Sequence, residues 1–66
     1  MKIKYFKDSD TALFEFNDRQ IIETREVSEN IYVDLDKDGN LVSMTVEHAA
    51  ERASFPEVAV EQMACE

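Results

Sequence analysis

Alternation of apolar and polar residues is the feature that most limits what this chain can fold into. Between residues 31 and 47, apolar side chains recur at every second position on both sides of the dipeptide Asp38-Gly39. A period of two places these side chains on one face of a β-strand, and Asp-Gly between two such runs is a strong hairpin signal. Shorter alternating runs occupy residues 2–5 and 12–16, separated by polar turn residues. Residues 20–27 form a further strand with a mixed pattern, in which neither face is cleanly apolar, and this suggests a sheet edge or a bulge. The sequence therefore predicts about five short antiparallel strands in a meander.

The pattern changes after Glu47. Residues 48–53 are rich in alanine and contain no β-branched residue, which predicts a short helix. Pro56 ends this helix, because the residue before a proline is pushed out of the α region. The predicted class is α+β, a small antiparallel β-meander followed by a short C-terminal helix, in a single domain over residues 1–53. Residues 54–66 form a tail whose pattern fits a strand or a helical turn and which is a candidate part of an oligomer interface.

Size and charge restrict the partners of the chain. Sixty-six residues allow only a small core, and a single cysteine rules out an intramolecular disulfide. Oligomerisation is the remaining means of stabilisation, so we expect a homo-oligomer, with a dimer favoured. Fifteen acidic residues against seven basic ones give a net charge of −8, which would repel a phosphate backbone and argues against direct nucleic-acid binding.

The sequence contains no pattern typical of a membrane protein. It contains neither an apolar stretch of about 20 residues nor a secretory signal pattern, so we expect no membrane contact and a cytoplasmic location. We also expect no cofactor.

The loop between the last two predicted strands resembles the start of a calcium-binding loop. Asp34, Asp36 and Asp38 take its first, third and fifth positions, and Gly39 follows at the sixth. The twelfth position, however, is Thr45 where a calcium loop needs a bidentate glutamate, and strand patterns flank the segment in place of helices. A hairpin turn is the favoured interpretation, and calcium binding through residues 34–40 remains an alternative.

Two further groups of residues are candidates for function. Arg25, Glu47 and His48 define a candidate functional corner, since a histidine beside a carboxylate can act as an acid or base near neutral pH. The favoured interpretation is structural, with Arg25 pairing with Glu47 or Glu51, because no nucleophile or oxyanion donor is identifiable nearby and no catalytic residue is assigned. The candidate interface residues are Phe6, Tyr32, Phe55, Val58 and Val60.

Several segments resemble a known family in their order and spacing. They are Met1-Lys2-Ile3-Lys4-Tyr5, Asp10-Thr11-Ala12-Leu13, Glu23-Thr24-Arg25-Glu26-Val27, Val33-Asp34-Leu35-Asp36, Asp38-Gly39-Asn40-Leu41-Val42 and Thr45-Val46-Glu47-His48-Ala49. Together they resemble short bacterial proteins of the domain of unknown function 2283 (DUF2283) over roughly residues 1–53. The resemblance implies a small β-meander with a C-terminal helix, and it implies no activity. Ser43 departs from the pattern, where a glycine is common.

These observations lead to one main hypothesis and two alternatives for function. The main hypothesis is a small non-catalytic module that self-associates or binds a protein partner in a regulatory role. One alternative is an acidic inhibitor or decoy that acts on a nucleic-acid-processing enzyme. The other is a calcium-binding protein.

Overall fold

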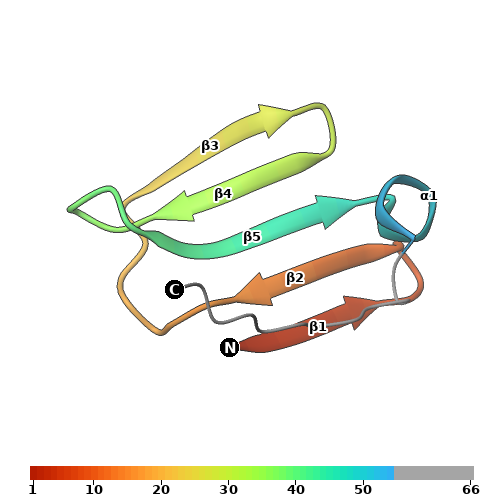
Figure 1. The fold of residues 1–66 in the computed structure, drawn as a ribbon, viewed down its shortest axis with the longest axis horizontal. Helices are drawn as coiled ribbons and strands as arrows, with labels where there is room; N and C mark the ends of the chain where they lie inside the picture. Colours follow the sequence, from red (N-terminus) through yellow and green to blue (C-terminus); the bar gives the residue numbers. More distant parts are fainter. Residues whose placement is uncertain (55–66) are drawn as a thin grey trace, which may run out of the picture.

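A computed structural model, which describes residues 1–54, shows five antiparallel strands in one sheet followed by a short helix (Figure 1). The elements are β1 (Lys2–Phe6), β2 (Thr11–Glu15), β3 (Glu23–Ser28), β4 (Ile31–Leu35), β5 (Leu41–Glu47) and α1 (Ala49–Ala53). This confirms the predicted α+β class, with five antiparallel strands before a short helix.

The order of the strands in the sheet is β1-β2-β5-β4-β3. The strands β3 to β5 form a meander and β1–β2 form a hairpin, and residues 16–22 carry the chain from β2 to the far edge of the sheet (Figure 1). The last strand therefore enters between β2 and β4. Its pairing with β2 places Phe14 opposite Met44 and Ala12 opposite Val46, so apolar side chains meet across the join.

The strand register separates apolar from polar side chains, because residues directly opposite each other in a sheet share a face. We call one side the apolar face, and on strands β1, β2, β4 and β5 it comprises Ile3, Tyr5, Ala12, Phe14, Ile31, Val33, Leu35, Leu41, Met44 and Val46. The other side, the polar face, carries Lys2, Lys4, Phe6, Thr11, Leu13, Glu15, Thr24, Glu26, Tyr32, Asp34, Ser43, Thr45 and Glu47.

Two irregularities adjust this alternation. The register shifts between Glu26 and Ser28 on the edge strand β3, in agreement with the mixed pattern of that segment. A second shift places Leu41 opposite Leu35. This shift leaves the buried Val42 without a counterpart on β4, while on the β2 side its carbonyl accepts a hydrogen bond from the Phe16 amide at 2.9 Å.

The main buried cluster is small and lies at one end of the apolar face. Among the described residues, the buried apolar side chains are Ala12, Val42, Val46 and Ala49, and no large side chain is fully buried. Ala49 of α1 packs on Ala12 and Val46, with Tyr5, Phe14, Ile31 and Met44 around them. A helix of five residues makes little more than one turn, so it covers only the end of the sheet where β5 runs into it (Figure 1).

Asp10, in the turn between β1 and β2, fastens this helix to the sheet. Its backbone carbonyl accepts a hydrogen bond from the Ala49 amide at 2.9 Å, and its carboxylate accepts one from the Ala50 amide at 3.0 Å. The Tyr5 hydroxyl donates to the same carboxylate, and these bonds from Tyr5 and Ala50 lower the pKa of Asp10. Asp10 thus does from a distant turn what an N-cap residue does locally, while His48 at the cap position has a left-handed backbone and makes no side-chain cap.

Two adjacent alanines of α1 test how closely the helix packs. Ala49 is fully buried and Ala50 is exposed. We expect Ala49→Leu to lower the free energy of unfolding by about 1–3 kcal/mol, because added methylenes overpack a filled site. The same change at the exposed neighbour, Ala50→Leu, should stay within about 0.5 kcal/mol of the wild type. Urea denaturation of both variants measures the difference, and equal effects would show that α1 is not seated on the sheet.

Candidate functional site

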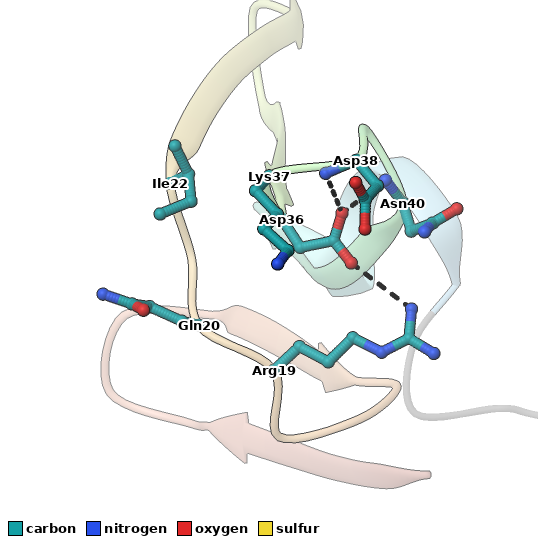
Figure 2. A pocket seen from close by; sticks show the side chains of 7 residues that line it. All are labelled: Arg19, Gln20, Ile22, Asp36, Lys37, Asp38 and Asn40. Atoms are coloured by element: carbon teal, nitrogen blue, oxygen red, sulfur yellow. Dashed lines mark hydrogen bonds and ion pairs between the residues drawn. The ribbon is translucent and has the colours of Figure 1, made fainter.

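A pocket of about 460 Å³ opens where residues 16–22 pass the turn between β4 and β5 (Figure 2). It is lined by Arg19, Gln20, Ile22, Asp36, Lys37, Asp38 and Asn40. A pocket with several charged groups is the first place to look for a site, so the partners of each group decide what it can do.

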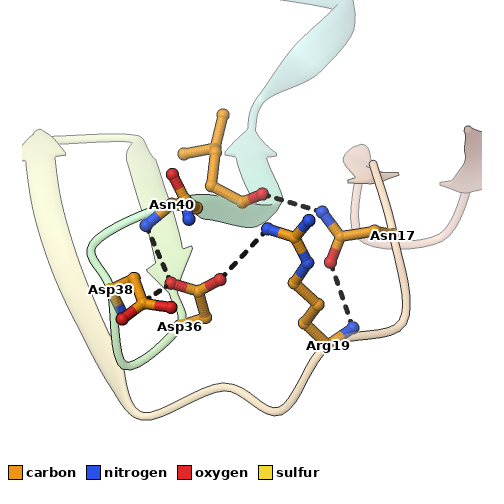
Figure 3. A network of polar contacts seen from close by, with 6 residues as sticks. Asn17, Arg19, Asp36, Asp38 and Asn40 are labelled. Carbon is orange, nitrogen blue, oxygen red and sulfur yellow. Dashed lines mark hydrogen bonds and ion pairs between the residues drawn. The ribbon is translucent and has the colours of Figure 1, made fainter.

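Asp36 is the centre of this region, and only 8% of its surface is exposed. Its Oδ1 accepts hydrogen bonds from the backbone amides of Asp38 and Asn40, both at 2.9 Å (Figure 3). The Asp36 amide donates to the Asn40 carbonyl at 2.9 Å, and Gly39, with φ of 80°, completes the turn. Alternation from Tyr32 and Asp34 would place Asp36 on the polar face, but Asp36 is buried, because the chain turns after Leu35 and brings the carboxylate back onto its own backbone.

Arg19 and Asn17 join the linker to this turn (Figure 3). Arg19 Nη1 lies 3.3 Å from Asp36 Oδ2, and the Asn17 side chain donates to the Leu41 carbonyl at 3.0 Å while it accepts the Arg19 amide at 3.0 Å. The sequence analysis assigned no role to Asn17 or Arg19. The pairing was not visible in the sequence, because Arg19 and Asp36 are 17 positions apart in the chain.

These contacts stabilise the charged form of Asp36. The pKa of Asp36 is lowered chiefly by the Asn40 amide, with help from the Asp38 amide and Arg19, against the opposing effect of burial. A carboxylate held in this way is a poor general base or acid near neutral pH. The pocket's central group therefore serves the structure of the turn.

The calcium candidates do not converge on one point. Asp34 accepts hydrogen bonds from Thr24 Oγ1 at 2.6 Å and from Ser43 Oγ at 2.5 Å on the polar face, whereas Asp36 is held by the turn. Within residues 1–54, no group of three or more histidine, cysteine, aspartate or glutamate side chains is placed to hold a metal ion. The structure supports the hairpin-turn interpretation of the loop, with Asp38 contributing its backbone amide.

The candidate corner is not assembled either. Arg25 binds Glu23, with Nε and Oε2 2.7 Å apart, and not Glu47 or Glu51. The register aligns Arg25 with Val33 at the edge of the apolar face, while Glu47 belongs to the polar face and His48 is exposed next to α1. The predicted tie between strand and helix is instead made by Asp10.

The candidate interface residues divide between two places. Phe6, 49% exposed, and Tyr32 lie on the polar face, where the charge of Glu47, burial and Glu26 raise the pKa of Tyr32. Phe55, Val58 and Val60 lie outside the described residues. The larger apolar surface is on the opposite side of the sheet, and the sequence signal for it was the alternation itself.

Comparison with known proteins identifies the family and goes no further. Residues 2–49 match the model of the family described as "Protein of unknown function (DUF2283)", and the chain belongs to this family. No curated protein and no solved structure matches the chain. In the described part, no helix has the length and apolar character needed to cross a membrane.

The carboxylate of Asp36 should make stability depend on acid pH. Its pKa is lower in the folded chain than the ordinary value of about 3.9, so the unfolded chain binds a proton first as the pH falls. Its stabilising contribution is thus present above about pH 4 and is lost as the pH falls through the folded pKa. We expect Asp36→Asn to have a lower free energy of unfolding than the wild type at neutral pH, and this difference should become smaller toward about pH 2. Urea denaturation at several pH values measures the difference.

A matched control is Asp38→Asn, which removes an equal charge at an exposed neighbour and keeps the backbone amide that Asp36 uses. At neutral pH, Asp38→Asn should lower the free energy of unfolding by less than Asp36→Asn does. A constant gap between wild type and Asp36→Asn across the whole range would contradict the role assigned to Asp36.

Proposed function

We propose that this member of the DUF2283 family is a non-catalytic binding module that acts through the apolar face of its sheet. The observation that carries the proposal is the mismatch between this face and its cover. Ten apolar side chains line the face on four adjacent strands, and α1 covers only the end around Ala12 and Val46. A sheet with one apolar face needs a second layer, and a partner can supply it.

The degree of burial supports the same conclusion. Ile3 and Leu41 are exposed, and Phe14, Val33, Leu35 and Met44 are only partly buried. Val33, Leu35 and Leu41 lie on strands with a neighbour on each side, and none of the described helices or strands lies across these three side chains. Burying such side chains contributes roughly 25 cal/mol per Å² of apolar surface removed from water, which favours association through this face.

The polar groups give less support to an enzyme. In the part of the chain that the structure describes, the pocket carboxylate of Asp36 is held by backbone amides and Arg19, and the exposed His48 is not joined by Arg25. A regulatory role through binding accounts for the apolar face and requires no catalytic role for Asp36 or His48.

The acidic-decoy alternative has weaker support from the polar face. Glu15 pairs with Lys4 at 3.0 Å, and Asp34 is bound by Thr24 and Ser43, so two of the carboxylates on this face already have internal partners. Salt-sensitive binding to a basic protein would favour this alternative over binding through the apolar face.

An apolar probe tests the proposal directly. At a protein concentration where the chain is monomeric by mass, the neutral dye Nile red should bind the wild type and gain fluorescence. We expect Val33→Lys to remove most of this signal, because a charge then lies in the middle of the apolar face. Thr45→Lys introduces the same residue on the polar face of an adjacent strand and should leave the signal close to that of the wild type.

Circular dichroism checks that both variants keep the sheet. Absence of dye binding by a folded monomeric wild type, or equal loss in both variants, would contradict a role for the apolar face.

A further inference from the structure

We propose that the partner of the apolar face is a second copy of this chain, packed face to face about a two-fold axis. This inference rests on the proposed function, since it requires the apolar face to be a binding surface. Each chain carries a net charge of −8, so an association of two copies must keep their acidic groups apart. The apolar face meets this condition, because the residues that β1, β2, β4 and β5 contribute to it include no charged side chain.

The edge strand β3 supplies the charges that border this face, and they are self-complementary. Glu23 and Arg25 are two residues apart, on the same side of the strand, and carry opposite charges. Their Cα atoms are therefore separated by about 7 Å. Consider a two-fold axis that lies between the two sheets, is perpendicular to the strands and passes between Glu23 and Arg25. This axis places β3 on top of the partner's β3, with the two strands antiparallel. Glu23 then faces the partner's Arg25, and Arg25 faces the partner's Glu23, as a self-complementary interface requires.

The same axis avoids the helix. Arg25 is aligned through Val33 with Met44, Phe14 and Ile3 across the sheet, while Glu23 is aligned with Leu35 and Leu41. The axis passes between these two rows, whereas α1 covers the row of Ala12 and Val46 on the far side of Met44. The half of each sheet that none of the described elements covers is thus brought against the same half of the partner. Met44 and Val33 meet the partner's Leu35 and the partner's Leu41, with the sheets about 10 Å apart.

The size of the apolar area left open by the described elements limits the strength of the dimer. The contact is four strands wide, with about 4.8 Å per strand, and four to five residues long, with about 3.3 Å per residue. The product is a footprint on the order of 300 Å² per copy. Standard stable interfaces bury about 800 Å² per partner, so this contact is smaller than those. The chain should therefore form a reversible dimer whose fraction rises with concentration.

Sedimentation equilibrium of the full chain from about 10 μM to about 1 mM tests the dimer and its geometry. We expect the wild type to approach twice the monomer mass at the upper end. Arg25→Glu should weaken dimerisation by about 10-fold or more, because it sets like charges against each other twice in a two-fold contact. The exchange variant Glu23→Arg/Arg25→Glu restores the reciprocal pairing and should return to within about 3-fold of the wild type.

The matched control is Lys4→Glu, which changes the net charge by the same amount on the polar face of the other edge strand. It should stay within about 3-fold of the wild type. Equal weakening by Lys4→Glu and Arg25→Glu, or an exchange variant that remains monomeric, would overturn the proposed geometry. A wild type that stays monomeric throughout would overturn the second-copy proposal. Nile red binding by that monomer would still support the apolar face as a binding surface for a different partner.

Discussion

The structure depends on one constraint, which is that a single sheet with one apolar face cannot bury that face by itself. Pairing of β2 with β5 joins the β1–β2 hairpin to the β3–β5 meander and makes the apolar face continuous over four strands. In the described part of the chain, one turn of helix covers part of this face. It buries Ala49 against Ala12 and Val46 and leaves larger side chains partly exposed. Hydrophobic surface left in this state is the main driving force for association, so the fold and the proposed function have the same physical cause.

Two aspartates hold the connections that this sheet needs. Asp10 bonds the amides at the start of α1 and sets the helix over the end of the apolar face. Asp36 bonds the amides of the β4–β5 turn and, through Arg19, holds the linker that crosses from β2 to β3. Both carboxylates lie where the chain changes direction, and their lowered pKa values reflect bonds that favour the ionised form. These polar positions organise the fold, and the surface proposed for binding is the apolar face.

The sequence predicted local structure better than it predicted contacts between distant residues. Alternation and the Asp38-Gly39 turn were sufficient for five antiparallel strands, and the alanine-rich segment was sufficient for the helix. The insertion of β5 between β2 and β4 was not predicted, because it depends on which strands bury the most apolar surface together. Arg19 with Asp36 and Asp10 with Ala50 were missed for the same reason, since each contact joins residues far apart in the chain. Arg25 was selected for a corner with His48, whereas the register places it on the border of the apolar face.

The central claim is that the apolar face is the contact surface, and distances between two chains measure this most directly. In a mixture of isotope-labelled and unlabelled protein, filtered nuclear Overhauser spectra report only contacts between different chains. The proposed arrangement predicts such contacts from Met44 and Val33 to the methyl groups of the partner's Leu35 and the partner's Leu41. It predicts none from Leu13 or Thr45, which belong to the polar face. Contacts between chains that involve Leu13 and Thr45 and not Met44 and Val33 would contradict the account.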